Sequence, residues 1–248
     1  MPAAMPRVLA IAGGVGGAKL ALGLSRLLSP DELTIVVNTG DDDTFHGLHV
    51  SPDVDTMIYA LAGLTNRQTG WGVEGDSFRT LDVLSRLGSE TWFQLGDLDL
   101  GLHLRRTELL QQGWTLSEAT RSIIDALGIA HPIFPMSDQP VRTIAVTELG
   151  EFAFQDYFVR QGCEPRITDI RFNGSATAQP TQGFADALDT ADAIVFCPSN
   201  PIVSIGPILA TPGVRAAIES FVGPRVAVSP LVGGRALKGP AGKMMAEL

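Results

Sequence analysis

Residues 7–40, with the sequence RVLAIAGGVGGAKLALGLSRLLSPDELTIVVNTG, decide the fold. This stretch opens with a short apolar run that ends in glycines, continues with leucines at helical spacing, and closes with a second apolar run rich in β-branched residues. Strand, helix and strand within about 30 residues form a βαβ unit, which implies a parallel sheet with a right-handed crossover. Continuous apolar runs are typical of strands that are covered on both faces.

The same pattern returns near the other end of the chain. It predicts helix, strand, helix and strand in turn, at residues 184–191, 192–200, 213–223 and 224–230. The segment between the two parts is different and begins with predicted helices at residues 53–64, 77–88, 96–113 and 116–128. Predicted strands follow at residues 141–148, 151–159 and 166–172.

Two local signals mark the boundaries inside this middle segment. Ser117 is the expected N-cap of the helix at 116–128, and Pro132, Pro135 and Pro140 are interpreted as a break in the chain. We therefore predict an α/β fold: a doubly wound, mostly parallel Rossmann-like sheet with a helical and antiparallel insertion. The chain 1–248 is expected to be a single domain, with a core at 7–64 and 181–248 and an insertion at about 65–180.

Composition and net charge restrict the class of partner. The 248 residues are 45% hydrophobic, enough for a buried core, and carry a formal net charge of −9. That charge argues against nucleic acid or a membrane as a partner, since both are bound by basic faces. Cys163 and Cys197 are expected to be free thiols in a reducing compartment. We expect neither a signal peptide nor a membrane span, and therefore a cytoplasmic protein.

The glycine-rich loop GGVGGAK stands at the carboxyl end of the first predicted strand. In open α/β sheets this place binds ligands, because glycines let the backbone approach a phosphate and the following helix offers free N–H groups. The dinucleotide fingerprint fails, since Lys19 replaces its third glycine and the second strand ends at Asn38 rather than at an acid; the Walker A spacing fails as well. A tight turn without a ligand is the alternative. The predicted phosphate-binding residues are Gly13, Gly14, Gly16, Gly17 and Lys19.

Two later loops end strands of the same predicted sheet. The loop CPSNPIVSIGPIL offers hydrogen-bonding groups on Ser199 and Asn200, with prolines that include Pro201 to stiffen it. The loop SPLVGGRALKGPAGK places Arg235 and Lys238 beside glycines, and such cationic loops bind phosphate oxygens. Surface solubility is the alternative for these two basic residues.

The segment at 37–56, VNTGDDDTFHGLHVSPDVDT, carries five carboxylates and neither lysine nor arginine. Like charges crowded in this way repel one another unless a cation lies among them, and Mg²⁺ is commonly held by one or two carboxylates together with substrate phosphates. Asp53, just after Pro52, is interpreted as a helix cap. His46 and His49 are not read as zinc ligands, because no third histidine or cysteine lies nearby. His103 and His131 receive no role.

Six motifs, in order between Arg7 and Met245, together resemble one known family. They are GGVGGAK, NTGDD with HGL and VSPDVDT, GWG, LGDLDLGLHLRRTELL, PSNPIVSIGPIL, and VAVSPLVGG with ALKGPAGKMM. The chain is similar to the 2-phospho-L-lactate transferase family, whose members are also called phosphoenolpyruvate transferases in some bacteria and act in coenzyme F420 biosynthesis.

The resemblance implies a Mg²⁺-dependent transferase of the EC 2.7.8 type. Such an enzyme moves 2-phospho-L-lactate or phosphoenolpyruvate from its guanosine diphosphate-activated form to the deazaflavin Fo. A ribitol hydroxyl of Fo attacks the phosphorus, GMP leaves, and F420-0 or dehydro-F420-0 forms. Phosphoryl transfer of this kind needs charge neutralisation and in-line positioning more than a strong nucleophile. The family also implies a homodimer.

Carried over to this sequence, the resemblance assigns roles to the loops. The glycine loop would cradle the diphosphate, Ser199, Asn200 and Pro201 would lie at the nucleotide, and Arg235 and Lys238 near the phosphates. The acidic segment would supply the Mg²⁺ ligands Asp41, Asp42 and Asp55, with Asp42 or Asp55 as the catalytic base. The Fo site would comprise Asn38, Thr39, Asp55 and Trp71, although a core position is equally compatible with Trp71.

Two departures and two alternatives accompany this interpretation. Family members usually continue for several dozen residues, so the C-terminal end of the family domain is expected to be missing here, and Asp43 lies outside the motif as a solvated charge. One alternative is a nucleotide-sugar-binding regulator of the gluconeogenesis-factor type, disfavoured by GDDDTFHG where that group carries a DDGGSSG-like segment. The other is an NAD(P) oxidoreductase, disfavoured by Lys19 and Asn38. The sequence does not select among phospholactate, phosphoenolpyruvate and 3-phosphoglycerate donors.

Overall fold

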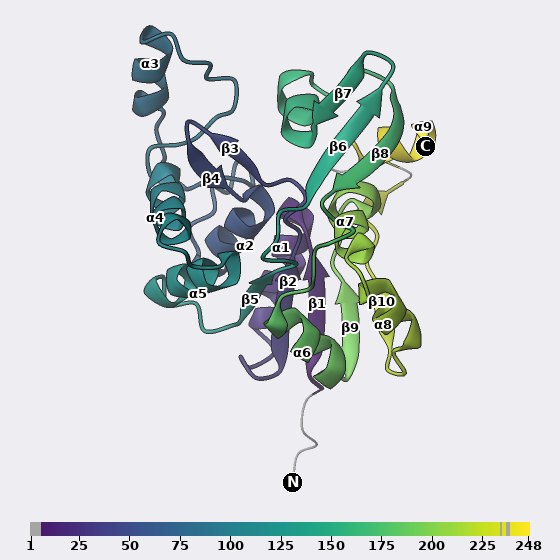
Figure 1. Cartoon of the computed structure of the whole chain (residues 1–248). Coiled ribbons are helices and arrows are strands. Elements are labelled where there is room, and N and C mark those ends of the chain that lie inside the picture. Colours follow the sequence, from purple (N-terminus) through teal and green to yellow (C-terminus); the bar gives the residue numbers. More distant parts are fainter. Residues whose placement is uncertain (1–5, 234, 237–238) are drawn as a thin grey trace.

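The predicted βαβ unit is present in the computed structural model, which describes residues 6–233, 235–236 and 239–248 (Figure 1). Strand β1 (Val8–Ala12) leads into helix α1 (Gly14–Ser25), which returns the chain to strand β2 (Leu33–Val37). Every residue of β1 is buried, as expected for a strand covered on both faces. The two strands pair in parallel, with Val8 opposite Leu33.

The central sheet has five parallel strands in the order β10-β9-β1-β2-β5. The strands outside the βαβ unit are β5 (Ile133–Pro135), β9 (Ala193–Phe196) and β10 (Arg225–Ala227). Because β1 lies between β2 and β9, the winding of the chain reverses there. The carboxyl ends of β1 and β9 therefore border the crevice in which open α/β sheets bind ligands.

Strand β5 corrects the predicted boundary of the insertion. It lies in the proline-rich segment that was interpreted as a break, yet it pairs in register with β2, Ile35 opposite Ile133. A proline is tolerated here because β5 is an edge strand and one of its sides makes no ladder hydrogen bonds. The stretch 65–180 is therefore two excursions from the sheet, separated by one strand of the core.

Helices cover both faces of the sheet, which confirms the doubly wound α/β class (Figure 1). Alternate residues of β1 divide between the faces: Ala10 belongs to one hydrophobic cluster and Leu9 to the other. The first face packs against α1, α2 (Pro52–Ala62) and α5 (Leu116–Ala126). The second packs against α6 (Gln182–Thr190), α7 (Gly206–Ala210) and α8 (Val214–Ser220).

The first excursion is helical, as predicted, and contains α3 (Arg79–Arg86) and α4 (Asp99–Gln111) before α5. The predicted N-cap of α5 was wrong. Thr115, rather than Ser117, caps this helix, since its hydroxyl accepts from the Glu118 N–H while the Glu118 carboxylate accepts from the Thr115 N–H. This reciprocal capping box is the T-x-x-E pattern in the sequence.

The second excursion is a small antiparallel sheet in the order β7-β6-β8. Its strands are β6 (Arg142–Thr147), β7 (Gly150–Ala153) and β8 (Ile167–Asn173). The predicted strand at 151–159 is strand only in its first part, because the chain turns into the short π-helix η1 (Asp156–Arg160). Tyr157 of η1 is fully buried against this sheet. The apolar residues of this run are therefore buried in a helical turn rather than in a strand.

The remaining elements are short. They are the hairpin β3 (Asp43–Phe45) and β4 (Leu48–Val50), the π-helix η2 (Pro201–Ile205), the hairpin β11 (Leu231–Val232) and β12 (Arg235–Ala236), and helix α9 (Ala241–Glu247). Cys163 and Cys197 are free, as predicted. In the described part of the chain no single helix is long and apolar enough to cross a membrane; Pro201–Ala210 and Val214–Ser220 meet that test only as a pair, bent by 94°.

Candidate functional site

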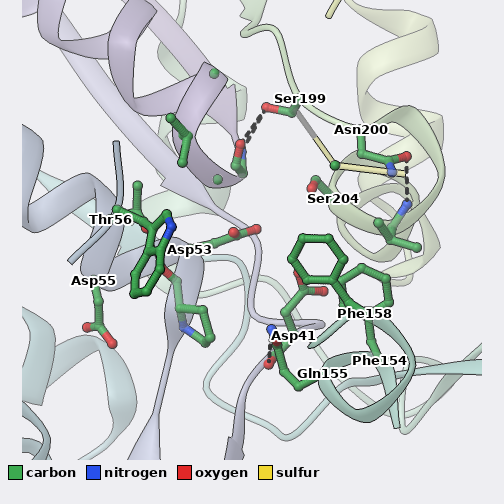
Figure 2. Close-up of a pocket in the computed structure, with 18 of the residues that line it drawn as sticks. Asp41, Asp53, Asp55, Thr56, Phe154, Gln155, Phe158, Ser199, Asn200 and Ser204 are labelled. Carbon is green, nitrogen blue, oxygen red and sulfur yellow. Dashed lines mark hydrogen bonds between the residues drawn. The ribbon is translucent and has the colours of Figure 1, made fainter. Parts of the chain in front are cut away.

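A cavity of about 1180 Å³ opens at the carboxyl ends of β1 and β9, where the winding of the sheet reverses. Segments far apart in the sequence meet in its wall (Figure 2). The lining includes Gly13, Gly14, Gly16, Lys19, Asp41, Asp53, Asp55, Trp71, Phe93, Phe154, Phe158, Pro198, Ser199 and Asn200. The second late loop also contributes, through Ser229, Pro230, Val232, Gly239 and Pro240. The predicted glycine loop, acidic segment and both late loops therefore share one site.

The glycine loop and the loop after β9 are tied together by Ser199. Its hydroxyl accepts a hydrogen bond from the Gly13 N–H at 3.0 Å and donates to the Gly13 carbonyl at 2.9 Å. A Cβ on Gly16 would lie 2.2 Å from the Pro198 carbonyl oxygen, so only glycine permits this approach. Helix α1 begins directly after Gly13 without a side-chain cap, and its positive end faces the cavity.

Asp41 and Asp53 are the buried carboxylates that face the cavity from the acidic segment (Figure 2). The Asp53 carboxylate accepts from the Asn38 amide at 2.9 Å and from the Gly14 N–H. Oδ1 of Asp41 is buried and has no hydrogen-bond partner within the described residues. Burial raises the pKa of Asp53 to about 6, and burial together with the neighbouring Asp53 charge raises the pKa of Asp41 well above its ordinary value. Two buried carboxylates therefore line this cavity, and the charge of Asp53 disfavours ionisation of Asp41.

Asp42 and Asp55 are held by polar contacts within the protein. Asp42 accepts from the Ser51 hydroxyl at 2.7 Å, lies 3.1 Å from Nε2 of His49, and is absent from the cavity wall. Asp55 borders the cavity, but both of its oxygens bond to the guanidinium of Arg106. Of the pair that was predicted to be catalytic, Asp55 is engaged through both oxygens, and Asp42 through Oδ2 while its buried Oδ1 has no partner within the described residues. Asp53, interpreted as a helix cap, faces the cavity.

The residues predicted to bind Fo are placed differently from one another. Asn38 and Thr39 are buried and are not in the cavity wall; Asn38 supports Asp53 from behind. Trp71 lines the cavity and is 47% exposed, so the core alternative for this side chain is excluded. The tryptophan lines the cavity together with Phe93, Phe154 and Phe158, and the rings of Phe154 and Phe158 lie parallel at 5.6 Å.

The predicted nucleotide and phosphate residues are partly structural. The Asn200 side chain accepts from the backbone N–H of Ile202 at 2.9 Å and caps η2, which starts at Pro201. Lys19 is exposed at the cavity wall. Lys238 lies outside the described residues, and of Arg235 only the backbone, in β12, is described.

A buried polar network on α4 was not foreseen. His103, Arg106 and Leu109 occupy one buried face of this helix at a spacing of three, a periodicity that the sequence contains. His103 lies 3.1 Å from Asp99, whose carboxylate also accepts from the Tyr59 hydroxyl. Burial raises the pKa of Tyr59; burial would also raise the pKa of Asp99, but its bonds to His103 and Tyr59 hold that pKa below the ordinary value.

Comparison with known proteins identifies the family of this chain. Residues 8–248 match the family model for 2-phospho-L-lactate transferase CofD. The chain belongs to this family.

Named relatives agree with this placement. A 2-phospho-L-lactate transferase of Methanococcoides burtonii is 40% identical over 238 residues, which cover 96% of this chain and 77% of the relative. A phosphoenolpyruvate transferase of Kitasatospora aureofaciens is 40% identical over 248 residues, 98% of this chain and 77% of the relative. The crystal structure of a UPF0052 family protein from Bacillus halodurans superposes with a TM-score of 0.63 at 21% identity over 90% of this chain and 68% of that one. That structure and this chain therefore share the same fold.

The CofD-family site offers few ligands of its own to a metal ion. No group of three or more histidine, cysteine, aspartate or glutamate side chains gathers around one point in the described residues. Asp41 and Asp53 nevertheless fit a hard cation that takes its other ligands from water and phosphate, because both are buried, repel each other, and leave Oδ1 of Asp41 unpartnered. The site thus joins a two-carboxylate position to a helix N-terminus and an apolar wall.

Proposed function

We propose that this CofD-family protein transfers a phospho-acid, 2-phospho-L-lactate or phosphoenolpyruvate, from its guanosine diphosphate-activated form to the deazaflavin Fo in F420 biosynthesis. GMP would be released and F420-0 or dehydro-F420-0 formed. One observation carries the proposal: a single cavity joins a carboxylate pair, a glycine loop at a helix N-terminus and an aromatic wall. Its volume of about 1180 Å³ is larger than most single-ligand pockets, in keeping with two bound substrates.

In this proposal the diphosphate lies against the glycine loop. The start of α1 provides N–H groups and a partial positive charge, and Lys19 stands on the same wall. The nucleotide lies towards Ser199 and Asn200, whose loop is held in place by the bonds from Ser199 to Gly13. The deazaflavin ring lies on the apolar wall, where Trp71 and Phe93 offer flat faces.

Mg²⁺ is proposed as the cofactor, held by Asp41 and Asp53 rather than by the set Asp41, Asp42 and Asp55. Bound Mg²⁺ neutralises charge that develops on phosphate oxygens during transfer. The chain itself orients the Asp53 carboxylate, through the Asn38 amide and the Gly14 N–H. These bonds fix the acidic wall before substrate arrives, which is the preorganisation that electrostatic catalysis requires.

In the transfer step the Fo hydroxyl oxygen forms a bond to phosphorus as the bond from phosphorus to the GMP oxygen breaks. The hydroxyl proton must leave, but a loose transition state demands little of a base. Of the two predicted bases, Asp55 borders the cavity and Asp42 does not. Asp55 is therefore the remaining candidate to accept this proton.

The test is direct synthesis. The protein is incubated with Fo, Mg²⁺ and guanylylated phospholactate, phosphoenolpyruvate or 3-phosphoglycerate in competition, and mass spectrometry follows F420-0, dehydro-F420-0 and GMP. We expect GMP and a deazaflavin product in equal amounts. Absence of both, together with tight binding of a UDP-sugar, would favour the nucleotide-sugar regulator. Trp71→Ala is expected to raise the KM for Fo by about tenfold with a smaller change in kcat.

The proposal extends to assembly. Homodimer formation is expected for this protein, and analytical ultracentrifugation of the purified chain would test it independently of activity.

A further inference from the structure

Arg106 is a fully buried guanidinium at the centre of the α4 face that meets the acidic segment. Its Nη1 donates to Oδ2 of Asp55 at 3.2 Å, and its Nη2 donates to Oδ1, so the pair is bidentate. Nη1 also lies 3.5 Å from the carbonyl oxygen of His49. A planar fork of this kind fixes the orientation of the carboxylate as well as its charge.

A second contact from the next residue of α4 reaches the same segment. The Thr107 hydroxyl accepts from the His49 N–H at 2.8 Å. Asp55 in turn accepts from the Ser51 N–H at 3.2 Å, and the Ser51 hydroxyl donates to Asp42 at 2.7 Å. Helix α4 therefore holds both ends of the turn that leads from β4 into α2.

The first turn of α2 carries two aspartates on opposite sides. Asp53 and Asp55 are two residues apart, which places them about 200° apart around the helix axis. The Asp55 carboxylate pairs with Arg106 of α4, whereas Asp53 faces the glycine loop and the cavity. The two carboxylates point in different directions (Figure 2). Any rotation of this turn moves both carboxylates together, so a clamp on Asp55 also sets the direction of Asp53.

We infer that Arg106, assisted by Thr107, is a positioning residue that sets the geometry of the cation site formed by Asp41 and Asp53. The inference rests on the proposed function for the identity of the cation. Arg106 itself reaches neither carboxylate of the site and acts through Asp55 and the first turn of α2. Residues that orient ligands in this indirect way typically change metal affinity 10–100-fold when they are altered.

The experiment measures Mn²⁺ binding to the full chain without substrates, from the loss of the free Mn²⁺ signal in electron paramagnetic resonance. Arg106→Lys keeps the charge and removes the fork, and it is expected to weaken Mn²⁺ binding about tenfold. Arg105→Lys is the matched control on the same helix, since the Arg105 side chain is 50% exposed and pairs with Glu108. Its Mn²⁺ affinity is expected to equal that of the wild type.

Thr107→Val keeps the inference testable if Arg106→Lys does not fold, as judged by circular dichroism. This variant removes the second contact and is expected to weaken Mn²⁺ binding about threefold. A folded Arg106→Lys within twofold of wild type overturns the inference, as does an unchanged Thr107→Val where that variant alone folds. Wild-type protein that binds Mn²⁺ but forms no deazaflavin product refutes the transfer reaction alone. Wild-type protein that binds no Mn²⁺ refutes both the inference and the metal part of the proposed function.

Discussion

Asp53 and Asp55 stand two residues apart on α2, and their surroundings are opposite. Asp55 forms an ion pair with the buried guanidinium of Arg106 and accepts two hydrogen bonds from it. Asp53 meets amide and backbone donors but no cation among the described residues, and its neighbours Asp41 and Asp42 are carboxylates. One side of the helix is therefore electrostatically complete in the protein alone, while the other side is complete only when a cation binds.

The largest expected effect is on transfer activity at the incomplete side. Asp53→Asn removes one charge from the cavity wall while keeping its shape, so we expect kcat for deazaflavin product formation to fall at least about 1000-fold. The matched control is Asp43→Asn, because within the described residues the Asp43 side chain bonds only to the neighbouring Thr44 N–H and lies outside the cavity wall. Its activity should stay within twofold of wild type. Equal losses in the two variants would mean that charge alone, and not position, matters.

The next largest effect concerns stability at the complete side. Arg106→Met leaves Asp55 buried without its cation and is expected to lower the free energy of unfolding by about 3–5 kcal/mol. Adding Asp55→Asn removes the stranded charge and should restore much of that loss. Urea denaturation of the single and double variants measures both values. If the double variant is no more stable than the single one, an unpaired charge is not the cause.

The sequence predicted the strands, helix and glycine loop that form this site better than it predicted the roles of the side chains in it. The glycine loop and the buried strands are local patterns, and β1, α1, β2, β9 and β10 lie where apolar runs and helical spacing predicted them. Strand β5 was missed because a strand of three residues, which follows Pro132 and ends at Pro135, carries too little pattern. The β3–β4 hairpin was missed as well. In the structure His46 and Gly47 both adopt positive φ, as its two-residue turn requires.

The aspartates show why roles could not be assigned from the chain alone. Whether Asp53 or Asp55 faces the cavity depends on the rotation of α2, and that rotation is fixed by contacts with residues far away in sequence. Arg106 lies 51 positions from Asp55. It is next to Arg105, and the sequence alone does not reveal that one is buried and the other exposed. Its spacing from His103 and Leu109 was the available signal.

Replacing Asp53, on the side of α2 that lacks a cation, is expected to raise stability by a smaller amount than the loss caused by Arg106→Met. The Asp53 pKa is raised from 3.8 to about 6 in the folded protein, so between these values the folded state binds more protons than the unfolded state. The stability that Asp53 contributes is then present below about pH 4 and is lost as the pH rises through 6. In metal-free protein at pH 7, Asp53→Asn should therefore be more stable than wild type by about 1–3 kcal/mol.

This gain has its own controls. It should vanish at pH 4, where the wild-type carboxyl is protonated, and saturating Mg²⁺ should reverse it by stabilising only the wild type. Urea denaturation at pH 4 and pH 7, each with EDTA or Mg²⁺, measures all four differences. A gain that is independent of pH would show that repulsion at the cavity wall is not its source.

The smallest effect on stability is expected at an exposed ion pair of the same kind as Arg106–Asp55. Arg160 pairs with Glu90 at 3.0 Å and lies 5.8 Å from the centre of the Trp92 ring, but the two charged side chains are 45% and 68% exposed. Water and salt screen such a pair, so Glu90→Gln should cost less than about 1 kcal/mol, and less again in 0.5 M salt. The stability of the Arg106→Met variant relative to wild type should not respond to salt in the same way, because its pair is buried.

A loss of several kcal/mol on Glu90→Gln would mean that burial does not explain why the two ion pairs differ in their contribution to stability. The difference between Asp53 and Asp55 would then need another cause, because it also depends on burial to make a modest attraction or repulsion large.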